Sequence, residues 1–554
     1  MEQNTMSTPA QPRPPGILTG LLVGILIALP VIAIFFALNA LVALPALPIN
    51  VMDWLPNNLP NDLLNFGKQT MADVLIALNI GRLDQVAKIA EGIIGTATLF
   101  GLIVLAIVAV FGIARTQKGP RAGTLTGLIV GLALGVLLVL MYASLPLVQF
   151  ERANALLIDS AYIMGMLVGS GLIAGLIYDR LTRLPETNSE IAASAEQLNR
   201  RQFLVRVGGS TATLTVAGAV VSLLRSAGAV EPVEEIVAPD SPTPSGPVEV
   251  VGMSDDFTAA PGTRSEYTPL EEHYRIDIVS RPPEIDAATW ALSMTGLVNN
   301  PQAFTLDQLR AMDSVSQFVT LSCISNSIGG DLISTTKWTG VKMQDLVALA
   351  DPQPEATYLK ITSADGFDEY VNLDLIREDE RIILAYAWDD RPLLQKHGFP
   401  VRIYIPNHYG MKQPKWITHM EFVPEWEEGY WVRRGWSASA LVQTTSVVDT
   451  VASDSVFEQD GTTYVPIGGI AYSGSRGISR VEVSIDEGGW LPATLKSPLS
   501  ELTWVLWRYD WPFAEGAHSF RVRTYDGNGG IQRADVTPQR PDGATGIHRV
   551  TRVL

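Results

Sequence analysis

The sequence has few of the residues that build disulfides and protein-ligated metal centres. It contains a single cysteine, Cys323, and six histidines among 554 residues. One cysteine cannot close an intramolecular disulfide, and one thiolate is too few ligands for structural zinc, which takes four. No C-x-x-C-H sequence is present, and no histidine lies in a long apolar stretch. These absences exclude a haem held by two histidines inside a membrane, and we expect no haem.

Positive charge is also scarce. The chain carries 40 Lys and Arg against 57 Asp and Glu, which gives a net charge of −17 at pH 7. An acidic protein without a basic stripe binds nucleic acid poorly, so we expect no nucleic-acid partner. Most acidic residues and tryptophans follow Val230, whereas nearly everything from Pro14 to Leu224 is apolar. The negative charge therefore belongs mainly to a soluble C-terminal half.

The N-terminal half contains long stretches without charge, as expected of helices that cross a bilayer. Pro30 in the first stretch predicts a kink, and glycines in the fourth would let neighbouring helices approach closely. The sequence predicts a membrane anchor of five helices, with spans at Gly16–Leu44, Gly92–Ala114, Gly123–Leu147, Ser160–Tyr178 and Val207–Leu224.

Lysine and arginine indicate the orientation of these spans. They gather in two loops, residues 115–121 and 179–206, which lie on one side if the helices alternate. The positive-inside rule makes that side cytoplasmic. Five spans then place the N-terminus in the cytoplasm and everything after Arg225 outside the cell membrane. Arg200 and Arg201 resemble a twin-arginine export signal, although ordinary flanking charge explains them equally well.

The pattern changes again after the last span. Residues up to Tyr267 are rich in Pro, Glu, Ser and Thr, which is typical of an extended linker. A globular α+β pattern follows, with strands expected at Tyr274–Val279 and Trp290–Leu297 and helices at Leu306–Met312 and Met343–Ala350. Short strands with Gly-rich turns after about Thr450 predict a β-sandwich. The expected domains are a tail (1–14), the anchor (15–224), a linker (225–268), a first soluble domain (269–445) and an immunoglobulin-like domain (446–554).

Cys323 is the residue with the clearest chemical potential. A β-rich run, Gln317–Leu321, leads directly into its Ser/Asn/Gly loop, and functional residues often lie in such loops. A single buried cysteine is more often a small apolar core residue. One thiolate can, however, anchor a metal whose other ligands belong to a cofactor.

Several separated motifs carry a resemblance to a known family. They are Tyr274-Arg275-Ile276-Asp277, Cys323 with Asn326, Lys337-Trp338-Thr339-Gly340-Val341, His397 to Arg402, Tyr409 to Trp416, and Ala471 to Ile478. In this order and spacing they resemble the sulfite-oxidase-type molybdopterin oxidoreductases, from about Glu271 to Leu554. The resemblance implies a molybdenum–molybdopterin cofactor, two-electron oxygen-atom transfer, and a C-terminal domain through which relatives form homodimers.

The resemblance also implies roles for individual residues. Cys323 would be the molybdenum ligand, since a thiolate is a soft donor. Arg402, Lys412 and Lys415 would supply positive charge for the pterin phosphate, although a solvated basic turn is the simpler reading of the same residues. The full set of expected cofactor-binding residues is Tyr274, Arg275, Ser322, Cys323, Asn326, His397, Arg402, Lys412 and Lys415.

One departure from the family bears on the substrate. Sulfite-oxidising members usually carry an arginine after the asparagine of this loop, whereas here Ser327 follows Asn326. Arg476 matches another family arginine and is expected to bind an anionic substrate, with a surface turn residue as the alternative. The substrate is expected to be a small oxyanion such as sulfite, or a sulfoxide-type oxo donor if the enzyme is a reductase.

The resemblance requires a separate electron partner, such as a small cytochrome or a quinone-linked protein. A third reading is a membrane-tethered binding module without catalysis. The joint presence of Cys323, His397, Arg402 and Lys415 argues against that reading.

Overall fold

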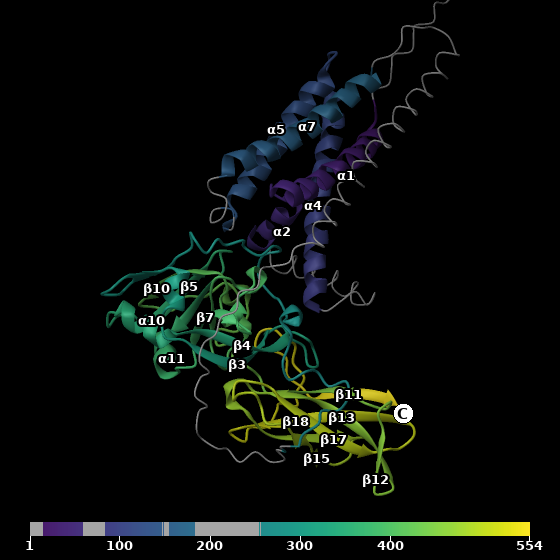
Figure 1. Ribbon diagram of the computed structural model, residues 1–554. Coiled ribbons are helices and arrows are strands. Elements are labelled where there is room, and N and C mark those ends of the chain that lie inside the picture. The colour runs from purple at the N-terminus through teal and green to yellow at the C-terminus, as the bar shows by residue number, and fades with distance from the viewer. Residues whose placement is uncertain (1–14, 59–82, 147, 149–154, 183–253, 255) are drawn as a thin grey trace, which may run out of the picture. The chain divides into compact units, whose positions relative to one another are not determined.

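The computed structural model describes residues 15–58, 83–146, 148, 155–182, 254 and 256–554 (Figure 1). The chain divides into two compact units, one formed mostly by residues before 232 and the other mostly by residues after that point. The predicted fifth span at 207–224, the Arg200-Arg201 pair and most of the predicted linker lie outside the described residues.

The first unit is helical. It contains α1 (Ile17–Val42), α2 (Leu47–Asn58), α4 (Leu83–Ala114), α5 (Ala122–Ala143) and α7 (Leu156–Thr182). All but α2 are long and apolar enough to cross a membrane. These four helices confirm the first four predicted spans and support a multi-pass membrane protein.

Helices α5 and α7 pack through glycine, as the sequence of the fourth span predicts. A Cβ added at Gly127 would lie 2.1 Å from the carbonyl oxygen of Gly171, so only glycine permits this approach. At the start of α5 the Asp179 carboxylate accepts the backbone N–H groups of Gly123 at 2.7 Å and Thr124 at 2.9 Å. A carboxylate there satisfies N–H groups that have no partner within their own helix.

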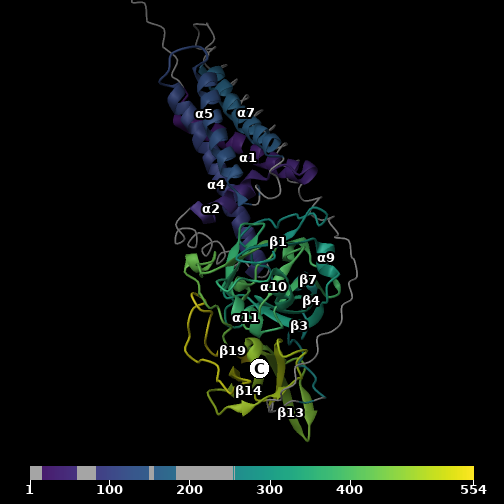
Figure 2. The same ribbon diagram turned by 90° about the vertical axis from the view of Figure 1, so that its left-hand side faces the viewer.

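The second unit begins with a β-rich domain containing two five-stranded sheets (Figures 1 and 2). One has the order β2-β1-β10-β5-β6, and the other has the order β3-β4-β7-β8 with β9 also paired to β7. The strands are β1 (Leu292–Gly296), β2 (Gln302–Phe304), β3 (Val315–Ser322), β4 (Ile333–Lys342), β5 (Tyr358–Ser363), β6 (Asp368–Asn372), β7 (Ile383–Trp388), β8 (Arg391–Pro392), β9 (Arg402–Tyr404) and β10 (Ile417–Val423).

Short helices connect these strands. They are α9 (Leu306–Arg310), α10 (Met343–Ala350) and α11 (Leu373–Glu378). The first two confirm the helices expected from the sequence. The strand expected at Tyr274–Val279 is wrong, because that segment forms no strand. Its backbone is satisfied by side chains instead: Ser334 accepts the N–H of Tyr274, and Lys415 donates to the carbonyl of Ile276.

The chain ends in a β-sandwich of the immunoglobulin or fibronectin III kind. Its strands are β11 (Thr445–Val451), β12 (Phe457–Gln459), β13 (Thr462–Tyr472), β14 (Ile478–Ile485), β15 (Leu491–Pro492), β16 (Thr494–Leu495), β17 (Val505–Pro512), β18 (Ala517–Asp526) and β19 (His548–Val553). The sheets β11-β13-β17-β16 and β15-β14-β18-β19 share a core that includes Val483, Trp507 and Phe520. This layering confirms the predicted sandwich.

Candidate cofactor site

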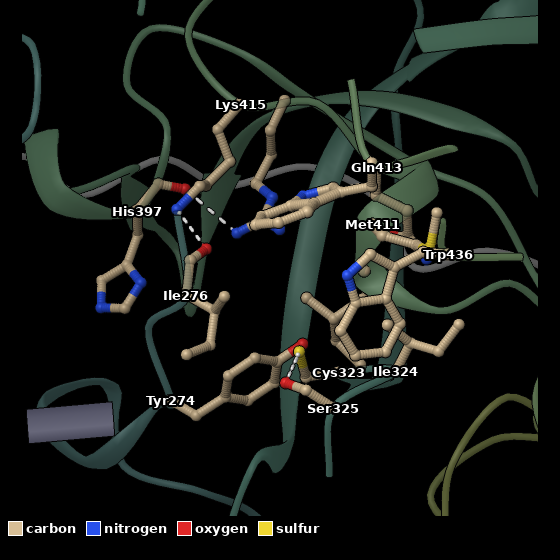
Figure 3. A pocket seen from close by; sticks show the side chains of 14 residues that line it. Tyr274, Ile276, Cys323, Ile324, Ser325, His397, Met411, Gln413, Lys415 and Trp436 are labelled. Atoms are coloured by element: carbon tan, nitrogen blue, oxygen red, sulfur yellow. Dashed lines mark hydrogen bonds between the residues drawn. The ribbon is translucent and has the colours of Figure 1, made fainter. Parts of the chain in front are cut away.

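A cavity opens at the end of β3, within the β-rich domain. Three stretches of chain form most of its wall: the loop that starts at Cys323, the turn from Gly410 to Lys415, and the segment that carries Trp431 and Trp436. Figure 3 shows Cys323 and Ser325 on one side of this cavity, with Lys415 on the opposite side.

The loop after β3 holds Cys323 in a fixed place. The Cys323 N–H donates to the Leu332 carbonyl at 2.9 Å, and the Asn326 side chain accepts the Leu332 N–H at 3.0 Å. The Cys323 residue is 7% exposed, and its Sγ lies 3.0 Å from the Ser325 hydroxyl. Burial raises the pKa of the Cys323 thiol, and the Ser325 hydroxyl opposes that rise only in part. A thiolate would therefore form here readily only with a cation beside it.

Arg402 brings positive charge into the cavity from β9. Its Nη1 donates to the His397 carbonyl at 3.1 Å, and its guanidinium lies 4.5 Å from the centre of the Trp338 ring. Its Nε is buried and has no hydrogen-bond acceptor among the described residues. Burial lowers the pKa of Arg402 to about 10. A buried guanidinium with an unused donor is a strong indication of an anionic ligand.

Lys415 is the second buried cation. Its Nζ donates to the Ile276 carbonyl at 3.1 Å (Figure 3). It also lies 3.3 Å from an Asp277 carboxylate oxygen and 4.4 Å from the centre of the Trp416 ring. Burial lowers the pKa of Lys415 to about 8, although Asp277 opposes the shift. An anion in the cavity would raise the pKa of this ammonium back toward its usual range.

His397 completes the polar side of the cavity. Burial, followed by the charges of His273 and Lys415, holds the pKa of His397 well below its usual range. The imidazole is therefore neutral at pH 7, with one ring nitrogen able to donate and the other able to accept. Gln413 adds a buried side-chain carbonyl oxygen that has no donor among the described residues.

These residues fit a molybdenum–molybdopterin cofactor. The cavity offers one thiol as a soft metal ligand, two cations for a phosphate, and a neutral imidazole and an amide for a polar ring. Of the expected site residues, the structure brings Tyr274, Cys323, His397, Arg402 and Lys415 to one cavity.

The other expected cofactor-binding residues do not line this cavity. Arg275 pairs with Asp277 at 2.6 Å. Asn326 closes the Cys323 loop, and Ser322 is buried at the end of β3. Lys412 forms a 2.8 Å ion pair with Glu369, with both side chains almost fully buried. A role for these residues in holding the cofactor remains a prediction, and Lys412 already has a carboxylate partner.

Arg476 lies in the sandwich, where its guanidinium is occupied. It donates to Asn407 at 2.6 Å, to the Val442 carbonyl at 2.9 Å and to Ser473 at 2.8 Å, and its Nε lies 3.1 Å from an Asp526 carboxylate oxygen. It does not line the cavity. The expected contact between Arg476 and an anionic substrate therefore remains a prediction without a matching contact in the structure.

Some wall residues were not expected from the sequence. Ser325 contacts the Cys323 sulfur, while Met411 and Gln413 line the cavity together with Lys415. Gly410, Met411, Gln413 and Lys415 all line the cavity, and Gly410–Lys412 forms a 3-10 helix from which the Lys412 side chain points to Glu369. The sequence signal for Met411 and Gln413 is therefore their place in the same short turn as Lys415.

Comparison with known proteins gives consistent results. Residues 279–431 match the oxidoreductase molybdopterin binding domain. The mitochondrial sulfite oxidase of Homo sapiens is 26% identical over 302 residues, covering 46% of this chain and 55% of that protein. The putative protein-methionine-sulfoxide reductase subunit YedZ1 of Azospira oryzae is 30% identical over 174 residues, covering 30% and 61%. The uncharacterized oxidoreductase YuiH of Bacillus subtilis is 29% identical over 151 residues, covering 27% and 74%.

Among solved structures, the sulfane dehydrogenase SoxCD from Paracoccus pantotrophus has a TM-score of 0.46 and 19% identity, covering 54% of this chain and 87% of that one. The chain spans about half the length of the human sulfite oxidase that it matches. The matching domain and its relatives, together with the cavity around Cys323, show that the chain belongs to the sulfite-oxidase-type family of molybdopterin-binding oxidoreductases.

Proposed function

We propose that this protein is a membrane-anchored molybdenum-cofactor oxidoreductase that catalyses two-electron oxygen-atom transfer. One observation carries the proposal: a single buried thiol shares a cavity with two buried cations, and one of those cations has a donor without an acceptor. A thiol alone would be a core residue, and buried cations alone would indicate only an anion. Together they match a ligand that is both a metal centre and a phosphate ester.

The chain's own residues have distinct tasks in this proposal. When bound, the molybdenum cofactor supplies the two-electron centre at which oxygen-atom transfer takes place. Cys323 acts as the thiolate ligand of the metal, and Arg402 and Lys415 bind the phosphate. His397 is neutral and hydrogen-bonds the pterin. Trp431 and Trp436, which line the cavity, limit the access of water to it.

The cavity favours a neutral oxo donor such as a sulfoxide. Arg402 and Lys415 are the cations that line it among the described residues, and the proposal assigns both to the cofactor. The loop after Cys323 contributes Ser325 and Ile324 to the wall, and Arg476 lies elsewhere. The match to a relative described as a putative methionine-sulfoxide reductase subunit supports this choice. Sulfite oxidation is the second candidate, supported by the longer match to sulfite oxidase.

We also propose the cellular arrangement predicted from the sequence. The loops at 115–121 and 179–206 carry the basic residues and lie in the cytoplasm, which places the N-terminus there too. The predicted fifth span at 207–224 then places residues 269–554 outside. Residues 269–445 form the cofactor domain and residues 446–554 the sandwich. Electrons come from a separate cytochrome or quinone-linked protein, and the sandwich mediates a homodimer.

The test is an assay of detergent-purified full-length protein, with Cys323→Ser as the control. We expect the wild type to oxidise a reduced viologen dye when methionine sulfoxide is added, and we expect the control to lose this activity. If the protein instead reduces an artificial electron acceptor only when sulfite is present, the proposed substrate is sulfite and not a sulfoxide. Absence of both activities in protein shown to hold molybdenum would overturn the oxygen-transfer proposal. Absence of molybdenum would favour the binding module.

A further inference from the structure

The sandwich contacts the chain at, or within a few residues of, each of the three segments that form most of the cavity wall. The first is β3, which ends at Ser322 and leads into Cys323. The Tyr472 hydroxyl donates to the Thr320 carbonyl at 2.8 Å, and the Trp504 N–H donates to the Thr320 hydroxyl at 2.9 Å. The strand that delivers the thiol is therefore held by two residues of the C-terminal domain.

The second segment carries Trp436. The Arg540 side chain donates to the carbonyls of Arg434 at 2.6 Å and Gly435 at 3.2 Å, and the Pro541 carbonyl accepts the Ser437 N–H at 3.1 Å. A Cβ added at Gly435 would lie 2.4 Å from an Arg540 nitrogen. The sandwich thus forms hydrogen bonds with the backbone on both sides of Trp436.

The third segment is the turn from Gly410 to Lys415, and Arg476 contacts the chain three residues before it, at Asn407. Arg476 Nη1 donates to the Asn407 side chain at 2.6 Å, while its Nε lies 3.1 Å from Asp526 at the end of β18. The same guanidinium also donates to the Val442 carbonyl and the Thr444 hydroxyl. It therefore joins the sandwich to the turn through donors that a lysine could not all replace.

Asn407 is in a left-handed backbone conformation. Its φ is +61°, in a region that asparagine adopts more readily than most residues with a side chain. Its side chain packs so closely against the sandwich that a Cβ added at Gly474 would lie 2.3 Å from its Oδ1. Three residues later the turn reaches Gly410, followed by Met411 and Gln413 in the cavity wall.

We propose that the C-terminal sandwich is a working part of the cofactor site, and that Arg476 is a positioning residue that sets the shape of the cavity through Asn407. In this role Arg476, which does not line the cavity, acts through the turn and not by direct contact with a ligand. It fixes the start of the turn from which Met411, Gln413 and Lys415 reach into the cavity. This inference rests on the proposed cofactor and adds the residues that determine how firmly it is held.

The test compares Arg476→Gln and Arg476→Lys with the control Arg508→Gln. Arg508 is a sandwich arginine of similar exposure, which bonds to Asp510 and Thr258 and makes no contact with the cavity wall. Each full-length protein is purified with its cofactor bound, and the loss of molybdenum and pterin is followed during dialysis. The Mo(V) paramagnetic resonance spectrum is recorded on the same samples.

We expect Arg476→Gln to release the cofactor about tenfold faster, the factor for losing one hydrogen bond to a charged group. Its Mo(V) g values should shift, whereas Arg508→Gln should match the wild type in both measurements. Arg476→Lys should recover only part of the loss. A structural effect confined to the sandwich would lower the unfolding temperature of Arg476→Gln without changing the g values, and that result would overturn the proposal.

A second variant keeps the test decisive if Arg476→Gln does not fold. Asn407→Gly retains the left-handed backbone and removes only the side chain that Arg476 binds. It should reproduce the faster release, and the double variant should be no faster than either single one. Additive effects, or wild-type release from Asn407→Gly, would overturn the role of Asn407. Wild-type protein without molybdenum would instead overturn the proposed function itself.

Discussion

Lys415 carries its positive charge at a position where burial opposes it. The folded protein lowers the pKa of this lysine from 10.5 to about 8, mainly by removing water from the ammonium. Between pH 8 and 10.5 the unfolded chain therefore holds a proton that the folded, cofactor-free chain has released. Because the unfolded state binds more protons in this window, the stability contributed by Lys415 rises with pH.

A pH series on cofactor-free protein checks this prediction. Lys415→Met should raise the free energy of unfolding at pH 7 by about 2 kcal/mol, since it removes the cost of a buried charge. Asp277 keeps Arg275 as a partner in the variant. The difference between variant and wild type should shrink from pH 8 to 10.5. A difference in the free energy of unfolding that stays constant from pH 8 to 10.5 would contradict the lowered pKa of Lys415.

Lys412 directly precedes Gln413, which lines the cavity, yet the Lys412 ammonium is paired with Glu369 and does not point into the cavity. The Glu369 side chain is fully buried, and burial raises its pKa against the effect of Lys412. Lys412→Met should lower the free energy of unfolding by about 3 kcal/mol, because it leaves a buried carboxylate without its cation. Glu369→Gln in the same chain should recover part of that loss, as measured by urea denaturation.

The cofactor content separates the two roles considered for Lys412. If it is structural, the double variant Lys412→Met with Glu369→Gln should still hold molybdenum and pterin. Loss of the cofactor from a double variant that remains folded would show that Lys412 binds it directly.

The loop between β3 and β4 is the element that shapes the thiol side of the site. Gly329 in this loop has a φ of +80°, and a Cβ there would lie 2.4 Å from the His548 ring of β19. Gly461, in the turn between β12 and β13, has a similar φ of +75° but open space around it. The two glycines therefore separate backbone strain from a clash with the sandwich.

Alanine at these two positions should have different effects. Gly461→Ala should cost about 1 kcal/mol of stability, from strain in the left-handed backbone alone. Gly329→Ala should cost more, about 3 kcal/mol, and should also lower the molybdenum content, because the Cys323 loop must move away from His548. Thermal unfolding and metal analysis measure both effects. An equal loss of stability in the two variants would show that the loop does not pack closely against His548 of β19.

For the whole molecule, much of the architecture could be predicted from the sequence where a local pattern dominates. Four spans are long apolar runs, and α10 begins and ends where its periodicity predicts. Short motifs indicate Cys323, Arg402 and Lys415 as site residues. The residues of Tyr274–Val279 favour a strand, but this segment bonds to side chains from β4 and from the turn at Lys415 instead.

The site residues that could not be placed from the sequence depend on distant partners. Arg476 is held by Asn407, 69 positions away, and by Asp526, 50 positions away. Lys412 is held by Glu369, 43 positions away. A sequence shows that these cations exist, but the acceptor that each one finds is set by how sheets and loops pack. A motif therefore predicts the type of site better than it predicts which partner each charged side chain contacts.

The orientation in the membrane is a prediction for the whole chain. In a Cys323→Ser background, a cysteine at Gln117 should react with a membrane-impermeant thiol reagent only from the cytoplasmic side. A cysteine at Glu458, an exposed position of β12, should react only from outside. The expectation follows from the basic loop at 115–121 and from the predicted fifth span at 207–224. Labelling of both positions from one side of the membrane would contradict it.

The central claim is that Cys323 binds molybdenum in the cavity. X-ray absorption at the molybdenum edge of purified wild-type protein and Cys323→Ser tests it most directly, because the method counts sulfur neighbours of the metal. The wild type should show molybdenum with sulfur ligands, and the variant should show one sulfur ligand fewer or no retained metal. Identical sulfur coordination in the two proteins would mean that the thiol is only a core residue.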